Sequence, residues 1–338
     1  MQSTTRPSCS TFWPISSSEL LPTRASDGAL LACWDLAAGS GGDHNGAGVP
    51  LLLVHGAALH AHCWSPAGQT LATSGLRPLA LDLRGHGHSD RSPRGDYSWE
   101  LFASDILSIV AGLVSGEAAT NFAAGSPAVG SPAVGSPAVG SPAVGHPAAG
   151  LPAVGHSAGA SALLLAEAAR PGTFSSLWLW EPITMAPGDV RREATRRAMA
   201  ERARRRREHF ASVEEARGHL EGRGMFAAFS EACFADFLSW GLVPDDDSGV
   251  RLACRGEDEA SVYEWQGLPE VLAKLPSVGC PVRVVGGQLS DAVPPDVIEG
   301  ISRLLPNGEA VVLPQLGHFG PFERPDVVAK DIEDWVLG

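Results

Sequence analysis

The stretch Gly155-His156-Ser157-Ala158-Gly159 decides how the rest of this 338-residue chain is interpreted. It follows the short apolar run 151–154 and precedes an Ala/Leu-rich segment that ends near Ala169. A strand that reverses sharply into a helix strains its turn residue, so small neighbours are needed on both sides of it. Such a turn lifts the Ser157 hydroxyl clear of the sheet and aims backbone N–H groups at the space beside it. Because the pentapeptide alone is not specific in a chain with 39 glycines, the surrounding sequence decides its meaning.

Upstream of this turn the sequence alternates between apolar strands and amphipathic helices. Asp27-Gly28 predicts a hairpin between two short strands within residues 15–36. Continuous apolar runs are typical of strands buried on both faces of a parallel sheet, and apolar residues at helical spacing predict helices that pack on it. The expected strands are 50–54 and 77–83, and the expected helices are 65–75 and 97–114. Together they predict a doubly wound α/β domain.

Residues 126–155 interrupt this alternation with six five-residue units: SPAVG four times, then HPAAG and LPAVG. Proline in every unit excludes a helix, so we expect an extended loop over 126–150 and a strand only in the last unit. We interpret the tract as a tandem expansion in a tolerant loop, with a partner-binding Pro-rich segment as the alternative. Deletion of 126–145 is therefore predicted to spare the chemistry.

A further strand at 175–180 ends at Glu181, and the character of the sequence then changes. Residues 184–275 are highly charged and predict an inserted helical cap, in which Trp240, Phe234 and Met185 are apolar candidates for a binding pocket or for simple core. Its arginine-rich start is interspersed with glutamates, which favours an ion-paired helix over an RNA-binding one. We thus divide the chain into a tail (1–14), a first core part (15–183), the cap (184–275) and a second core part (276–338).

Composition narrows the class of protein. At 44% hydrophobic residues the chain can bury a sizeable core, and its net charge of −13 argues against nucleic-acid binding. No apolar run is long enough to predict a membrane span. The six cysteines lack metal-site or paired spacing, which favours reduced thiols and a cytoplasmic location. The Ser/Thr-rich residues 1–18 leave an organelle-targeting leader open.

Three chemically suited residues follow separate strands in the order Ser157, Asp291 and His318. Together with five sequence blocks, this order resembles the serine-nucleophile α/β-hydrolase family. The blocks are LLLVHGAA (51–58), LDLRGHGHSD (81–90), GHSAGA (155–160), VVGGQLSDAVPP (284–295) and GHFGPFERPD (317–326). The resemblance implies an α/β-hydrolase fold: a mostly parallel, eight-stranded sheet flanked by helices, with an antiparallel strand in the first hairpin and an inserted cap.

The resemblance also implies roles for these residues. A serine hydroxyl needs a base to become a nucleophile, and the imidazole of His318 can take its proton and return it to the leaving group. A buried carboxylate orients that imidazole, and we favour Asp291 for this role. The backbone N–H groups of Ala57 and Ala158 match the family's oxyanion-hole positions. These roles need neither a cofactor nor a metal.

The expected function is a serine hydrolase that cleaves an ester or related acyl bond of a small molecule through an acyl-enzyme. Carbon–carbon bond hydrolysis or lyase chemistry with the same triad is an alternative within enzymes, and a non-catalytic binding protein is an alternative of another class. The oligomeric state and the substrate are left open.

Alternatives remain for the triad acid and for the roles of the other histidines. Glu181 rivals Asp291 as the triad acid, because it ends the strand after the Ser157 turn, where some members of the family place their acid. Among the other histidines, His55 and His86 are expected to hold loops together. His60 and His62 are candidates for the border of the pocket.

Overall fold

The computed structural model describes residues 19–37, 48–115, 150–184, 190–245, 249–265 and 269–338. Among these residues, eight strands form one sheet in the order β1-β2-β4-β3-β5-β6-β10-β11. Their bounds are β1 Glu19–Arg24, β2 Leu30–Asp35, β3 Val49–Val54, β4 Leu76–Leu81, β5 Ala153–His156, β6 Leu177–Trp180, β10 Val282–Gly287 and β11 Gly308–Leu313. Strand β2 pairs antiparallel with β1 and β4, whereas every other neighbouring pair is parallel. The predicted eight-stranded, mostly parallel sheet is confirmed.

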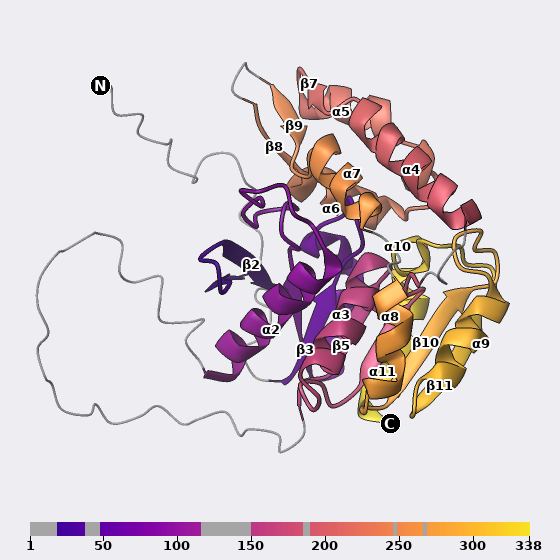
Figure 1. Ribbon diagram of the computed structural model, residues 1–338. Coiled ribbons are helices and arrows are strands. Elements are labelled where there is room, and N and C mark those ends of the chain that lie inside the picture. Colours follow the sequence, from indigo (N-terminus) through magenta and orange to yellow (C-terminus); the bar gives the residue numbers. More distant parts are fainter. Residues whose placement is uncertain (1–18, 38–47, 116–149, 185–189, 246–248, 266–268) are drawn as a thin grey trace, which may run out of the picture.

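Helices cover both faces of this sheet because alternate strand residues point to opposite sides. In β3, Leu52 and Val54 join the core cluster that contains α2, α3 and α9, whereas Leu51 and Leu53 join the cluster that contains α1 and α11. The helices that flank the sheet are α1 Ser65–Thr73, α2 Trp99–Ser115, α3 Ala158–Ala169, α9 Pro295–Leu304, α10 Gly320–Glu323 and α11 Pro325–Leu337. Figure 1 shows α2 and α3 side by side in front of the strands.

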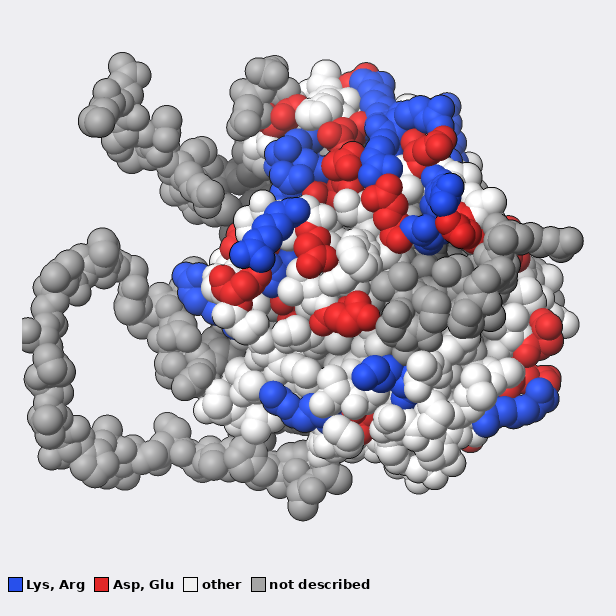
Figure 2. Space-filling view, in the orientation of Figure 1, with Lys and Arg blue, Asp and Glu red and all other residues white. Residues whose placement is uncertain are grey.

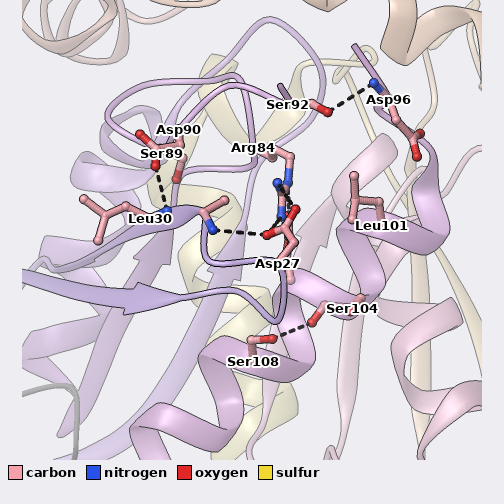
Figure 3. Close-up of polar contacts among 12 residues, drawn as sticks. Asp27, Leu30, Arg84, Ser89, Asp90, Ser92, Asp96, Leu101, Ser104 and Ser108 are labelled. Atoms are coloured by element: carbon pink, nitrogen blue, oxygen red, sulfur yellow. Dashed lines mark hydrogen bonds and ion pairs between the residues drawn. The ribbon is translucent and has the colours of Figure 1, made fainter. Parts of the chain in front are cut away.

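The predicted Asp-Gly hairpin is present and is tied to the sheet by a buried cation. Strands β1 and β2 pair from Glu19 opposite Asp35 to Arg24 opposite Leu30. The guanidinium of Arg84, just beyond β4, donates to Asp27 in the turn at 2.8 and 3.1 Å (Figure 3) and to Asp105 of α2 at 2.7 and 2.9 Å. One side chain therefore joins the hairpin, a strand end and a helix.

The insertion, which we define as residues 184–275, contains helices and an unexpected small sheet. Its described elements are α4 Val190–Arg205, β7 His209–Phe210, α5 Val213–Leu220, the 3-10 helix η3 Gly224–Ala227, α6 Glu231–Gly241, β8 Leu242–Pro244, β9 Val250–Leu252, α7 Gly256–Glu264 and α8 Pro269–Lys274. Strands β7, β9 and β8 pair antiparallel. In Figure 1, α4 to α7 gather at one end of the molecule, while α8 lies beside α3.

Contacts with the sheet domain hold the insertion in place. Arg91, in the loop after β4, donates to the buried Asp258 of α7 at 2.5 and 2.8 Å. Helix α6 packs on the 3-10 helix η1 (Ala61–Trp64), which follows β3. Val271 of α8 and Leu275 belong to the main core cluster although they lie within residues 184–275. The division of the chain into core and cap remains a proposal.

Several sequence-based predictions concern residues outside those described: the tail 1–14, the leader within 1–18, the repeat up to residue 149, and Met185. Among the described helices, none is long and apolar enough to cross a membrane. The five described cysteines are free and buried.

Candidate active site

Ser157 occupies a strained turn between β5 and α3, as the sequence predicts. Its φ of 54° and ψ of −119° are unusual for a residue with a side chain, and its N–H donates to Trp180 O at 2.9 Å. A Cβ at Gly155 would lie 2.6 Å from Ala160 Cα, and one at Gly159 would lie 2.4 Å from His55 O. Both glycines are therefore required by close backbone approach.

The predicted oxyanion-hole amides lie on the two segments that meet at this turn. A Cβ at Gly56 would lie 3.0 Å from Ser157 Cβ, so the chain after β3 passes directly against the turn. Ala57 and Ser157 line the same cavity, and Ala158 is the first residue of α3. Neither the Ala57 nor the Ala158 N–H has an acceptor among the described residues. Both donors are available to a developing negative charge.

His318 faces a buried carboxylate, and this carboxylate belongs to Glu181. The His318 Nδ1–H donates to Glu181 Oε2 at 2.6 Å. The same oxygen accepts the Ser290 hydroxyl at 2.7 Å, while Oε1 accepts the Gly287 N–H at 2.9 Å. Glu181 is fully buried, so three donors compensate the loss of water around its charge. With Nδ1 occupied, Nε2 is the free nitrogen of His318.

The sequence favours Asp291 as the carboxylate that orients His318, whereas the structure pairs His318 with Glu181. Asp291 comes after β10 as expected, but it is exposed on the wall of the cavity, and His318 Nδ1 bonds to Glu181 instead. Its neighbour Ser290 reaches the site instead, through its bond to Glu181. The difference arises because Glu181 has a left-handed backbone, with φ of 46°, directly beyond β6. Sequence spacing could not predict that conformation. The position of Glu181 at the end of a strand was the signal that made it an alternative to Asp291 as the triad acid.

The backbone of His318 is held by two side chains that the sequence analysis did not assign. His318 O accepts Trp180 Nε1–H at 2.9 Å and His156 Nε2–H at 3.1 Å. Burial lowers the pKa of His156 well below its ordinary value, with a further contribution from His318. His156 is therefore a neutral donor whose role is to position the loop. Its place beside Ser157 in the pentapeptide was the only available signal.

His55 and His86 form hydrogen bonds with the loops around them. His55 donates from Nδ1 to Gly56 O and accepts the Leu83 N–H at Nε2, while His86 bridges Arg84 O and the Ala58 N–H. Their predicted role in holding loops together is confirmed.

His60 and His62 do not line the large cavity that Ser157 faces, so they are not the pocket border that the sequence suggested. His60 donates to Phe237 O at 3.2 Å, and His62 stacks on Trp240 with ring centroids 3.7 Å apart. Burial lowers the pKa of His60 to about 4 and that of His62 to about 2.

A cavity of about 1540 Å³ lies between the sheet domain and the insertion. Ser157, His318 and Asp291 line it from the sheet domain, and α4 and η3 contribute from the insertion. Trp240 and Phe234 are packed into the core and do not line this cavity. Ser157 Oγ has no hydrogen-bond partner among the described residues. Within the described residues, no cluster of three or more side chains suited to metal binding occurs.

Comparisons with known proteins agree with this architecture. The model of the alpha/beta hydrolase family matches residues 51–331. The sequence is 35% identical over 69 residues to a non-heme chloroperoxidase of Kitasatospora aureofaciens, a match that covers 20% of this chain and only 24% of that protein.

Two solved structures share the fold over nearly the whole chain. An E-2-(acetamidomethylene)succinate hydrolase superposes with a TM-score of 0.69 at 20% identity, covering 95% of this chain and 100% of its own. A thermophilic esterase from Thermogutta terrifontis superposes with a TM-score of 0.62 at 23% identity, covering 95% and 98%. Since the family model matches most of the sequence, the chain belongs to the alpha/beta hydrolase family.

Proposed function

We propose that the protein is a serine hydrolase that cleaves an ester or related acyl bond of a small molecule through an acyl-enzyme. Ser157 is the nucleophile, His318 the general base and Glu181 the carboxylate that orients His318. The observation that carries the proposal is the 2.6 Å bond from His318 Nδ1 to the buried Glu181, beside a serine on a strained turn. Asp291 forms part of the cavity wall in this assignment.

In the first half of the reaction, Ser157 Oγ attacks the substrate carbonyl carbon while its proton passes to His318 Nε2. The bond to Glu181 fixes the tautomer that leaves Nε2 free, and the carboxylate stabilises the imidazolium that forms. The Ala57 and Ala158 N–H groups stabilise the oxyanion, each contributing about 3 kcal/mol to lowering the barrier. His318 then returns the proton to the leaving alcohol as the carbon–oxygen bond breaks.

In the second half, water attacks the acyl-enzyme and His318 takes its proton. The tetrahedral intermediate collapses, the acid product leaves, and Ser157 Oγ regains a proton from His318. Substrate binding has to bring Ser157 Oγ within reach of His318 Nε2, because catalytic hydrogen bonds are often long in ligand-free enzymes. The neutral His156 supports this geometry through its bond to His318 O.

A fluorophosphonate probe followed by a panel of esters of graded acyl length tests the proposal. We expect covalent labelling of the wild-type protein and none of the Ser157→Ala variant, together with ester turnover in the wild type only. Absence of labelling in folded protein would favour a non-catalytic binding role. Labelling without turnover of any ester or thioester would favour carbon–carbon bond chemistry.

A further inference from the structure

The wall that the insertion contributes to the cavity is rich in arginine. Five arginines line the cavity: Arg196, Arg202, Arg206, Arg207 and Arg223. The carboxylates in the described lining are Glu259, which pairs with Arg206, and Asp291 on the opposite side. In a protein whose net charge is −13, such a local excess of cations is not explained by composition.

The arginines on the outward face of α4 are paired with carboxylates. Figure 2 shows basic side chains gathered over the insertion with acidic ones between them. Each of three arginines that point away from the cavity has a carboxylate partner. The pairs are Arg197 with Glu193, Arg204 with Glu257 and Glu264, and Arg205 with Glu201. The predicted ion-paired helix is therefore correct for this face.

The cavity face of the insertion is different. The side chains of Arg202, in α4, and Arg223, just before η3, are exposed and have no hydrogen-bond or ion-pair partner among the described residues, whereas Arg207 pairs with Glu215. Arg196 and Arg206 use their terminal nitrogens on main-chain oxygens, and Arg206 also pairs with Glu259, but the buried Nε of each has no acceptor there. Buried donors without acceptors are costly, which applies to Nε of Arg196 and Arg206, and the exposed guanidinium groups of Arg202 and Arg223 remain unpaired among the described residues, so this wall is suited to an incoming anion.

We propose that the cavity selects esters that carry a second, anionic group, and that Arg202 and Arg223 bind that group. This inference rests on the proposed function and names its substrate class. Guanidinium groups bind carboxylate or phosphate oxygens through paired hydrogen bonds, which a neutral group cannot replace. Ile183, Met199 and Phe226 supply apolar lining, so the substrate combines an apolar middle with a charged end.

Matched ester pairs measure this selectivity on either side of the scissile bond. On the acyl side, the mono-4-nitrophenyl ester of glutaric acid is compared with 4-nitrophenyl pentanoate, which has a methyl group in place of the carboxylate. On the alcohol side, 4-acetoxybenzoate is compared with 4-acetoxybenzamide. The variants are Arg202→Gln and Arg223→Gln, and Arg197→Gln is the control because it removes the same charge from the outward face of α4.

One of the two ester pairs should show the selectivity. For that pair, we expect wild-type kcat/KM to be at least about tenfold higher for the anionic ester than for the neutral one. Arg202→Gln and Arg223→Gln should each lower the anionic value about tenfold and leave the neutral value within about twofold. Arg197→Gln should leave the ratio unchanged. An unchanged ratio in both cavity variants, or an equal fall in all three, would overturn the proposal.

Failure of the proposed function is distinguishable from failure of this inference. If the fluorophosphonate probe does not label Ser157 and no ester turns over, binding of glutarate and of neutral pentane-1,5-diol is measured by saturation-transfer NMR. Glutarate binding that is lost in Arg202→Gln and Arg223→Gln but kept in Arg197→Gln would support the anion site alone. No binding, or equal binding by all variants, would overturn it.

Discussion

Glu181 is fully buried, and hydrogen bonds from its surroundings stabilise its carboxylate. Its N–H donates to Val285 O at 2.8 Å, and its carboxylate accepts from Gly287, Ser290 and His318. A left-handed conformation costs a non-glycine residue about 1 kcal/mol or more, and it persists only where its surroundings enforce it. The contacts from β10 do so here.

At this scale we predict the outcome of two substitutions. Glu181→Gln should lower kcat for a hydrolysed ester by about three to four orders of magnitude, because the amide favours the wrong tautomer of His318. Asp291→Asn should change kcat less than about threefold, because Asp291 is exposed and does not contact His318. Steady-state kinetics on variants with native circular dichroism measure both. A large loss in the aspartate variant alone would return the role to Asp291.

At the scale of elements, the buried Arg84 couples the first hairpin to α2. Its side chain and that of Asp105 are 1% and 2% exposed, so either charge left alone would be almost without water. Burial raises the pKa of Asp105, while the hydrogen bond from Arg84 opposes this effect. Removing one partner of such a pair destabilises the fold strongly, whereas replacing both partners with apolar residues changes the free energy of unfolding much less.

Arg84→Met should therefore lower the free energy of unfolding by about 3 kcal/mol or more. The double variant Arg84→Met/Asp105→Leu should regain about 2 kcal/mol of that loss, because no uncompensated buried charge remains and Asp27 is exposed to water. Urea denaturation of the wild type, both single variants and the double variant measures the coupling. Strictly additive losses would show that the pair does not act as a unit.

The repeat tract is a second element-scale feature, although its residues 126–149 lie outside those described. The described chain leaves α2 at Ser115 and resumes at Gly150, before the amino end of β5. Ser157 follows the opposite, carboxyl end of that strand, where sites in α/β sheets are built. Deletion of residues 126–145 should therefore leave kcat and fluorophosphonate labelling unchanged. A folded deletion protein without turnover would contradict this.

At the scale of the whole molecule, buried histidines link stability to pH. Burial lowers the pKa of His55, His60, His62, His86 and His156 below the ordinary 6.5. The unfolded chain therefore binds more protons than the folded one below pH 6.5, so stability falls as pH falls. Asp236, whose pKa burial raises to about 6, acts in the opposite direction, as do Asp105, Glu323 and His209, whose pKa values are also raised.

We predict a marked loss of unfolding free energy between pH 7 and pH 5. His60 alone, with its pKa lowered to about 4, should account for about 2 kcal/mol. His60→Gln keeps a donor for Phe237 O and removes the titrating group, so its urea unfolding should depend less on pH by that amount. Equal pH dependence in variant and wild type would exclude His60 as a contributor.

The sequence by itself determined the alternation of strands and helices and the turn at Ser157, and its resemblance to the α/β-hydrolase family implied the eight-stranded sheet and the role of His318. The first two features rest on local chemistry: apolar runs bounded by glycine and proline, small residues where backbones approach closely, and an Asp-Gly turn. The requirement for glycine at 155 and 159 is an example, because any side chain there would collide with backbone atoms.

Only the tertiary structure decided which carboxylate meets His318, where the insertion's arginines point, and that 184–275 contains a small sheet. Glu181 and Asp291 both follow strands, and their reach depends on backbone angles and neighbours far apart in sequence. Arg197 pairs with Glu193 while the Arg202 side chain has no partner among the described residues, because Arg202 lines the cavity and Arg197 does not. Such choices depend on long-range packing, which the order of residues along a strand or helix does not specify.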